Sequence, residues 1–348
     1  MSARRVLITG VTGQDGGYLA ERLLADGDEV IGAARAPDGA FERAGLESLA
    51  GRVPLLRMDL LDPDSIRRAV AEAAPEEIYH LAAPTFVPAS WEDPSETMAA
   101  IASGTATLLA AAGDGPRVLV AASSEIFGDA GVSPQSESSP MRPRSPYAAA
   151  KLGAHALVGA LRAHHGRFLV SAITFNHESP RRPERFLPRK VSAGVAAIAA
   201  GRAQALTLGS LDAVRDWSHA RDVVEGMVLA LRHDEPRDWV FASGVGRTVG
   251  ELVDAAFAAA GAARVDGDGR DRVQVDPRFV RAPERWAPVG DPSDARALLG
   301  WAPRTSFEAL VGEMVAADLA LLRGAEAEPA SVDPPAAGRP APGPAGGA

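Results

Sequence analysis

The chain begins with a short aliphatic strand pattern, "RRVLIT", which runs directly into the glycine-spaced segment "GVTGQDGG" and then into a helical pattern. Gly10, Gly13 and Gly16 recur at three-residue spacing between the predicted strand and the predicted helix. Glycines at these places allow a tight turn and let a pyrophosphate approach backbone N–H groups at the positive end of the helix. This opening therefore predicts a dinucleotide-binding βα unit in a parallel sheet.

The rest of the first half alternates short aliphatic runs with longer segments of helical period. This alternation is typical of a parallel sheet with helical crossovers on its faces. Two helices carry clear start signals, because Asp62 is followed by Pro63 and Ser145 by Pro146. The predicted strands cover residues 4–9, 28–34, 53–58, 76–82, 117–123 and 168–175.

The alternation weakens after about residue 176, where Arg, Pro and Gly become frequent, and this change indicates a second region that closes over the carboxyl edge of the sheet. Ligands bind at that edge in open α/β folds. We therefore expect an α/β protein: a Rossmann-like, doubly wound parallel sheet with a smaller, mixed α/β C-terminal region that binds the substrate. The dinucleotide-binding Rossmann domain is predicted at residues 1–175 and 211–242, and the substrate-binding domain at residues 176–210 and 243–324.

Composition narrows the class of protein. The 348 residues are 46% hydrophobic, as expected for a soluble globular chain of two domains. No cysteine is present, so disulfides and thiolate metal sites are excluded, and we expect no metal.

The sequence also bears on location and partners. We find no signal peptide, and no apolar run approaches the length of about 18 residues that a bilayer-spanning helix needs, so we expect a cytoplasmic location without a membrane partner. The net charge of −9 argues against nucleic-acid binding. Residues 325–348, rich in Pro, Ala and Gly, predict a disordered tail.

The residue after the second predicted strand bears on which dinucleotide binds. NAD sites usually end this strand with an acidic residue for the ribose hydroxyls, but here the strand ends in Arg35, with no acid before Asp38. We therefore expect NADP, with a solvated arginine at a loop start as the alternative interpretation. Asp59 and Leu60, after the third strand, are expected to flank the adenine.

Tyr147 and Lys151 are four residues apart on one predicted helix, so their side chains share a face. A tyrosine must lose its proton to act as a base, and its ordinary pKa of about 10 is too high for neutral pH. A nearby ammonium, together with the positive charge of a nicotinamide, would stabilise the phenolate and lower that pKa. The Tyr-x-x-x-Lys pattern is common by itself, but it is specific after a glycine loop and a strand that ends in serine.

That strand ends in the stretch "VLVAASSEIFGD", in which Ser123, Ser124 and Glu125 follow a buried run. Strand ends often carry such residues, so a capping serine and a solvated carboxylate are the simplest interpretation. The alternative is a proton-transfer site at the carboxyl edge of the sheet.

Together these motifs resemble the extended short-chain dehydrogenase/reductase family, in which a strand-end Ser or Thr, a Tyr and a Lys handle a sugar hydroxyl beside a nicotinamide. Within it, "GVTGQDGGYLAERLL", "RPRSPYAAAKL", "FNHESPRR", "RDWSHARDVVEGM" and "GWAPRTSFEALVGEMV" are similar to the GDP-mannose 4,6-dehydratases. The resemblance covers about residues 4–323. It implies a hydro-lyase of deoxysugar biosynthesis that converts GDP-mannose to GDP-4-keto-6-deoxymannose, with tightly bound NADP recycled in each turnover.

The resemblance also implies a role for each catalytic candidate. Ser123 would hydrogen-bond the carbon-4 oxygen of the hexose, Tyr147 would be the base for its hydroxyl, and Lys151 would support Tyr147 and bind the nicotinamide ribose. Glu125 would remove the carbon-5 proton once carbon-4 is a ketone, and would then assist loss of water from carbon-6. Hydride return to carbon-6 would complete the reaction. The other cofactor-binding residues expected are Gly10, Thr12, Gly13, Gln14, Asp15, Gly16, Leu81, Ala83, His177 and Arg182.

The basic segment "NHESPRRPERFLPRK" would lie along the nucleotide sugar by the same resemblance. Arginine forks suit phosphate oxygens because they are planar and bidentate, although a run of arginines is also common on a solvated face. In the relatives, the loop with His177 and Arg182 lies at a subunit contact, which implies a homodimer or homotetramer. The substrate-binding residues expected are Thr85, Asn176, Lys190, Arg215, Arg281 and Glu284, the last near the ribose or base.

Two departures from the family pattern affect these expectations. The loop after the fourth strand reads Pro84-Thr85-Phe86 where typical relatives have Gln-Ser-His, so an apolar ring replaces a polar one beside the sugar. Pro183 follows the arginine pair where relatives have glycine, and it would stiffen that loop. The alternatives are a related dehydratase or 4-epimerase acting on a different nucleotide sugar, and a non-catalytic NADP-binding protein.

Overall fold

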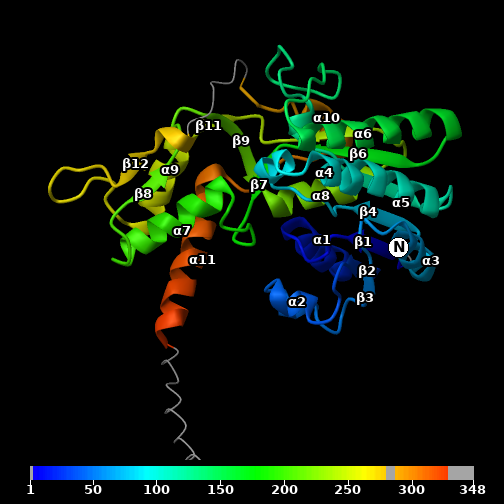
Figure 1. Cartoon of the computed structure of the whole chain (residues 1–348), viewed down its shortest axis with the longest axis horizontal. Helices are drawn as coiled ribbons and strands as arrows, with labels where there is room; N and C mark the ends of the chain where they lie inside the picture. The colour runs from blue at the N-terminus through cyan, green and yellow to red at the C-terminus, as the bar shows by residue number, and fades with distance from the viewer. Residues whose placement is uncertain (1–2, 280–286, 328–348) are drawn as a thin grey trace, which may run out of the picture.

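The computed structural model describes residues 3–279 and 287–327, and a seven-stranded sheet dominates this part of the chain (Figure 1). Its strand order is β10-β6-β5-β4-β1-β2-β3, and every pair in it is parallel. The order reverses beside β1, so the carboxyl ends of β1 and β4 flank the crevice where such sheets bind ligands. The strands are β1 (Arg5–Thr9), β2 (Glu29–Ala34), β3 (Leu55–Arg57), β4 (Glu77–His80), β5 (Arg117–Ala121), β6 (Leu169–Thr174) and β10 (Asp238–Phe241).

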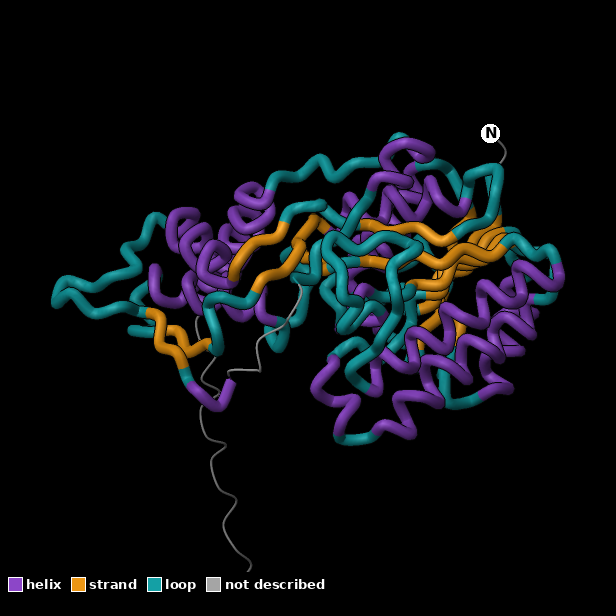
Figure 2. The backbone as a smooth tube through the Cα atoms, turned by 90° about the horizontal axis from the view of Figure 1, so that it is seen from above, coloured by secondary structure: helices purple, strands orange, loops and turns teal. Residues whose placement is uncertain are grey.

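The strands predicted from the sequence are all present, and the Rossmann-like fold class is confirmed. Helices cover both faces of the sheet (Figure 2). Successive side chains of a strand point to opposite faces, and because apolar side chains lie on both faces, both need a cover. In β1, for example, Val6 and Ile8 join the hydrophobic cluster on one face, whereas Leu7 joins the cluster on the other. The first face carries α1 (Gln14–Ala25) and α8 (Ala220–Leu231), and the second carries α3 (Pro63–Ala73), α5 (Gly104–Ala112) and α6 (Pro146–His165).

The predicted helix starts are confirmed by their caps. The Asp62 carboxylate accepts hydrogen bonds from the N–H groups of residues 64 and 65, each at 3.1 Å, and Ser145 Oγ accepts from the Ala148 N–H at 3.1 Å. The shorter helices of this region are α2 (Ala40–Arg43), α4 (Pro94–Met98), the 3₁₀ turns η1 (Glu47–Leu49), η2 (Val87–Trp91) and η4 (Ser124–Ile126), and the π-helical turn η3 (Ala99–Ser103).

The C-terminal region forms two small sheets, which confirms its predicted mixed α/β character. β9 (Val214–His219) pairs with β7 (Asn176–Glu178) in parallel and with β11 (Gly246–Thr248) antiparallel, and β8 (Leu206–Leu208) pairs in parallel with β12 (Val273–Val275). A separate hydrophobic cluster fills this region. The helical elements here are α7 (Leu187–Ala199), α9 (Val249–Ala260), η5 (Pro277–Phe279) and α11 (Phe307–Ala327). The remaining helix, α10 (Ser293–Leu299), packs instead against α8 and against β10 of the large sheet.

The chain crosses between the two regions more than once. β9 lies in a small sheet, although its residues fall in the range predicted for the NADP-binding domain, and then α8 and β10 return to the large sheet. The domain boundaries stay a prediction. Of the predicted tail, residues 325–327 belong to α11, and residues 328–348 lie outside the described residues. No helix within the described ranges is long and apolar enough to span a bilayer.

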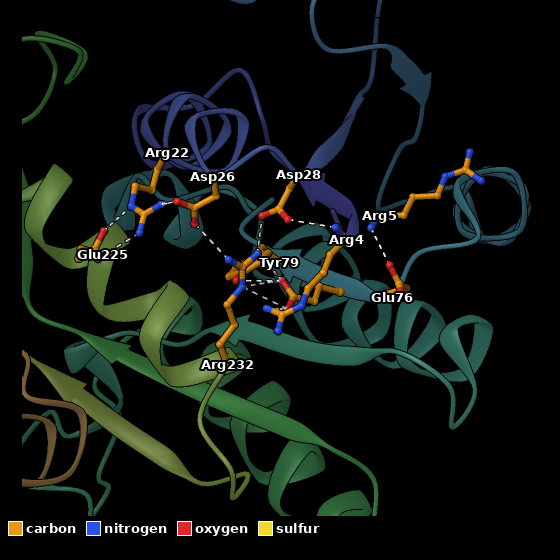
Figure 3. Close-up of polar contacts among 10 residues, drawn as sticks. Arg4, Arg5, Arg22, Asp26, Asp28, Glu76, Tyr79, Glu225 and Arg232 are labelled. Atoms are coloured by element: carbon orange, nitrogen blue, oxygen red, sulfur yellow. Dashed lines mark hydrogen bonds and ion pairs between the residues drawn. The ribbon is translucent and has the colours of Figure 1, made fainter. Parts of the chain in front are cut away.

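A partly buried charge network holds the returning segment against the amino edge of the large sheet (Figure 3). Arg232 directly follows α8. Its Nη2 lies 2.5 Å from Asp28 Oδ2 and 3.2 Å from Glu77 Oε2, and its Nη1 lies 3.1 Å from Asp26 Oδ2. Arg4 Nη1 is 2.9 Å from Glu77 Oε1, and the Glu77 side chain is only 2% exposed. These five residues, the Arg232 network, join α8 to α1, β1, β2 and β4 at the edge opposite the ligand crevice.

Candidate active site

The glycine loop keeps bare backbone at the start of α1. Gly10 has a φ of 72°, which favours glycine, and a Cβ there would lie 2.8 Å from the Ala82 backbone nitrogen. A Cβ on Gly16 would lie 2.6 Å from the Val11 Cα, so the first turn of α1 packs directly on the loop. Gly13 is the N-cap of α1, and no side chain of the described residues caps this helix end. These residues fit a dinucleotide, whose pyrophosphate needs accessible N–H groups at a helix start.

Gln14 and Asp15 connect this loop to β7 within one chain. His177 Nε2 lies 2.9 Å from Asp15 Oδ2, and Gln14 Nε2 donates to the His177 carbonyl oxygen at 3.1 Å. Burial by itself would raise the pKa of Asp15, but the His177 ring beside it brings that pKa below its ordinary value. Burial would lower the pKa of His177, but the Asp15 carboxylate brings it above the ordinary value. The two side chains therefore form an ion pair beside the cofactor loop.

Arg182 lies next to that ion pair. Its Nε is 3.2 Å from the carboxylate of Glu178, which is 2% exposed, and its positive charge contributes to the lowered pKa of Asp15. Burial raises the pKa of Glu178, whose principal opposing influence is Arg182. The structure thus places His177 and Arg182 beside the glycine loop of the same chain. Their predicted place at a subunit contact stays a prediction.

Ser123, Tyr147 and Lys151 come together at the carboxyl end of β5. Lys151 Nζ donates to the Ala121 carbonyl oxygen at 2.7 Å and lies 6.0 Å from the centroid of the Tyr147 ring. Burial raises the pKa of Tyr147 to about 12, although a hydrogen bond with Ser123 acts in the opposite direction. Burial also lowers the pKa of Lys151 to about 8. In the protein alone, burial therefore outweighs the lowering expected from Lys151, and Tyr147 keeps its proton at neutral pH.

Glu125 belongs to the 3₁₀ turn η4, which the buried side chains of Ile126 and Phe127 anchor in the core. Its N–H donates to Ser123 Oγ at 3.3 Å, so Ser123 does cap this turn. Glu125 is exposed, as a solvated carboxylate would be. Its charge nevertheless contributes to the raised pKa of Tyr147, after the larger effects of burial and of Ser123. The carboxylate therefore lies within electrostatic reach of the Tyr147 hydroxyl.

A hydrogen-bonded chain beneath these residues was not predicted. The N–H of Ala82 donates to Thr9 Oγ1 at 3.1 Å, Thr9 Oγ1 is 2.8 Å from His80 Nδ1, and His80 Nε2 is 3.1 Å from Thr105 Oγ1. Thr105 Oγ1 donates to the Ile101 carbonyl oxygen in the π-helical turn η3, so it accepts from His80 Nε2–H. Thr9 then donates to His80 Nδ1, and the ring is neutral.

Burial of the ring, with the nearby Lys151 charge, lowers the pKa of His80 to about 3. This series of hydrogen bonds holds residues 81–83 against β1. The segment includes the cofactor candidates Leu81 and Ala83. The sequence did contain a signal for this network, because His80 is a polar residue at the end of a buried strand. It was predicted only as part of that strand.

The remaining cofactor candidates occupy the carboxyl edge of the sheet. Arg35 directly follows β2, is exposed, and has no hydrogen bond or ion pair with another described side chain. Asp59 follows β3, and its carboxylate accepts a hydrogen bond from the Leu61 N–H at 3.0 Å. The neighbouring Leu60 is half-buried. Thr12 lies in the glycine loop. The structure thus brings the candidates from three different βα turns to one edge.

The substrate candidates that the structure describes come from the loop after β4 and from the C-terminal region. Thr85 is exposed in that loop, and Asn176 begins β7 opposite Trp217. Lys190, on α7, has its Nζ 5.1 Å from the centroid of the Phe279 ring. The other described candidate is Arg215 on β9, and the last two, Arg281 and Glu284, lie outside the described residues.

Comparison with known proteins finds relatives along most of the chain. The family described as GDP-mannose 4,6 dehydratase matches residues 7–314. A GDP-mannose 4,6-dehydratase of Sinorhizobium fredii is 41% identical over 93% of this chain and 99% of its own length, and the GDP-mannose 4,6 dehydratase of Homo sapiens is 39% identical over 91% and 92%.

Solved structures show the same arrangement of elements. RMD from Pseudomonas aeruginosa, complexed with NADPH, superposes with a TM-score of 0.75 at 25% identity and covers 92% of this chain and all of its own. The UDP-glucose 4-epimerase of Thermus thermophilus, in complex with NAD, has a TM-score of 0.77 at 27% identity over 90% of this chain and 98% of its own. Because the family match extends over most of the length in which the glycine loop, Glu125 and the Tyr147–Lys151 pair lie, the chain belongs to the GDP-mannose 4,6-dehydratase family.

Proposed function

We propose that this protein is an NADP-dependent GDP-mannose 4,6-dehydratase, a hydro-lyase that forms GDP-4-keto-6-deoxymannose. The observation that carries the proposal is the position of Glu125 on the turn that Ser123 caps, with Tyr147 hydrogen-bonded to Ser123 and Lys151 beside the Tyr147 ring, in a chain of that family. Oxidation and reduction alone need only the serine, tyrosine and lysine. A carboxylate beside them supplies the extra proton transfer that elimination of water requires.

The side chains divide the proton transfers between them. Ser123 would hydrogen-bond the carbon-4 oxygen, and Tyr147 would accept the proton of the carbon-4 hydroxyl. Bound NADP would supply hydride acceptance at carbon-4 and hydride return at carbon-6. Glu125 would remove the carbon-5 proton, made acidic by the carbon-4 ketone, and the protonated carboxyl would donate to the oxygen that leaves carbon-6 as water. When hydride returns to carbon-6, carbon-5 would take up a proton, which balances the one that Tyr147 accepted from the carbon-4 hydroxyl.

The raised pKa of Tyr147 makes the oxidised nicotinamide part of this acid–base chemistry. At a pKa of about 12, the phenol needs positive charge nearby before it can lose its proton at neutral pH. Lys151 lies beside the ring, where it would also bind the nicotinamide ribose. Tyr147 would therefore become a competent base only when the oxidised cofactor is present.

We propose NADP rather than NAD because Arg35 stands where an acidic residue would bind the ribose hydroxyls. Its guanidinium is exposed at the end of β2 and has no anionic partner within residues 3–279 or 287–327. Asn176, Lys190 and Arg215, with Arg281 and Glu284, would bind the nucleotide diphosphate and its nucleoside. The cytoplasmic location and the homodimer or homotetramer are further proposals, made from the sequence.

The function is tested by incubating the protein with GDP-mannose and no added reductant, and by following the sugar by NMR. We expect a 4-keto-6-deoxy product with no net consumption of NADPH. GDP-glucose, UDP-glucose and dTDP-glucose in parallel reactions test the base and the sugar. Recovery of only a carbon-4 epimer would mean that the protein is an epimerase.

The role of Glu125 is tested by Glu125→Gln. This variant should bind NADP normally and lose at least about a hundredfold in turnover, the scale expected for a positioned general base. Glu72→Gln, an exposed carboxylate on α3, is the matched control and should keep full turnover. Unchanged turnover in Glu125→Gln would refute the proposed elimination step.

A further inference from the structure

The loop after β4 meets the start of α7 in a cluster of two rings and two arginines. The rings of Phe86 and Phe186 pack edge to face, with centroids 5.6 Å apart and planes at 85°. The Cζ of Arg182 lies 3.7 Å from the Phe186 centroid, and the Cζ of Arg185 lies 5.4 Å from the Phe86 centroid and 5.5 Å from that of Phe186. We call these four residues the Phe86–Arg185 cluster.

The two arginines of this cluster differ in their other contacts. Arg182 is paired with the buried Glu178. Arg185 is exposed and makes no hydrogen bond or ion pair through its side chain with any other described residue. Arg185 lies within cation–π distance of both rings, and this contact uses none of its five N–H donors, which stay available to an anion. Arg185 is therefore a cation that the rings orient and that no carboxylate of the described chain neutralises.

The loop that presents Arg185 is anchored in the protein. The backbone of residues 183–186 forms a turn in which the N–H of the last residue donates to the carbonyl of the first at 3.1 Å. Arg189, paired with the buried Asp318, donates to the carbonyl oxygens of Pro180 and Arg182 at 2.5 Å and 3.1 Å. Because this backbone is already ordered, binding of a ligand to Arg185 involves little loss of conformational entropy in the loop.

The cluster adjoins the candidate active site. Val87, the neighbour of Phe86, packs against the buried group that contains Tyr147, and the charge of Arg182 acts on the Tyr147 hydroxyl. On the other side, Arg185 precedes the first turn of α7, which carries Lys190. Arg185 thus stands between the loop expected to contact the hexose and the helix expected to contact the diphosphate.

We propose that Arg185 binds the diphosphate of the nucleotide sugar, and that Phe86 and Phe186 are positioning residues that hold its guanidinium. This inference rests on the nucleotide-sugar function proposed above. It also gives a physical reason for the apolar ring at position 86, because a phenyl ring attracts a guanidinium, whereas a protonated histidine would repel it. The dinucleotide carries a diphosphate too, so the test compares the two ligands.

The test measures binding of GDP and of NADP by titration calorimetry to the full-length protein and to Arg185→Met, Phe86→Leu and the double variant. Arg185→Met should weaken GDP binding about tenfold, as for loss of a charge-assisted hydrogen bond, and leave NADP binding unchanged. Phe86→Leu should weaken GDP binding about 2- to 10-fold, the range for aromatic and cation–π contacts, but should have no effect in the Arg185→Met background. Arg185→Lys should recover part of the loss.

Arg52→Met is the matched control, because Arg52 is also an exposed arginine outside the cluster, and it should bind GDP as the wild type does. Normal GDP binding by Arg185→Met, or an equal effect of Phe86→Leu in both backgrounds, would overturn the proposal. Weakened NADP binding with unchanged GDP binding would overturn it as well. Failure of the proposed function is seen separately, as wild-type protein that binds GDP but forms no keto sugar.

Discussion

At the scale of single residues, His80 has the most specific consequence for the response to pH. Its neutral ring is buried between Thr9 and Thr105, and burial lowers its pKa to about 3 from an ordinary value of 6.5. Between these two values the unfolded chain binds a proton that the folded chain does not bind. The free energy of unfolding should therefore fall as the pH falls from about 6.5 towards 3, by up to about 1.4 kcal/mol per pH unit from this residue.

Substitution of His80 by Asn removes this titration. The variant should be less stable at neutral pH, because it breaks the hydrogen bonds to the two threonines, but its stability should depend less steeply on pH between about 6.5 and 4. Urea unfolding at a series of pH values measures the slope. His164→Asn, an exposed histidine at the end of α6, should leave the slope as in the wild type. Equal slopes in wild type and His80→Asn would contradict the assignment.

At the scale of elements, α1 can pack closely against the glycine loop because Gly16 has no side chain. A Cβ on Gly16 would meet the Gly10 carbonyl oxygen and the Val11 Cα, both backbone atoms that cannot turn aside. Gly16→Ala should therefore lower the free energy of unfolding by about 1–3 kcal/mol and weaken NADP binding. Thermal unfolding and a cofactor titration measure the two effects.

Gly159→Ala is the control for this prediction. Gly159 lies inside α6, and a Cβ there would have no atom within 4 Å. Alanine is the better helix former, so this variant should be more stable by about 0.5–1 kcal/mol and bind NADP normally. A Gly16→Ala protein as stable as Gly159→Ala would show that the helix can shift away from the loop.

At the scale of the whole molecule, the Arg232 network joins the segment that returns from the C-terminal region to the amino edge of the large sheet (Figure 3). Arg232→Met would leave the carboxylates of Asp28 and Glu77 buried, with Arg4 and the Tyr79 hydroxyl as the remaining described partners of Glu77. We expect the free energy of unfolding to fall by about 3–5 kcal/mol, the cost of breaking a buried ion pair from one side. Urea unfolding measures it.

The kinetic constants of Arg232→Met at 25 °C should stay near those of the wild type, because the network lies at the edge of the sheet opposite the candidate active site. Arg67→Met removes an exposed arginine whose partner Asp64 is also exposed, and its unfolding curve should match the wild type. Loss of turnover without loss of stability in Arg232→Met would place the network in the catalytic machinery instead.

The extent of sequence-based prediction differed between elements and side chains. The strands around Val6 and the cap at Asp62 were predicted correctly, because alternation and capping depend on residues a few positions apart. The pKa of Tyr147 was expected to fall beside Lys151, but burial raises it in the protein alone. The network around His80 was not predicted, because its partners come from β1 and α5.

The amino-acid sequence by itself determined the parallel βα architecture, the bare backbone at the start of α1 and the shared face of Tyr147 and Lys151, since covalent spacing and helical or strand period are properties of nearby residues. The tertiary structure decided which distant residues meet: His177 with Asp15, and Arg185 with Phe86. It also decided how far each titratable group is buried. Those contacts and pKa values depend on desolvation and on packing between segments far apart in the chain, which the folded molecule alone establishes.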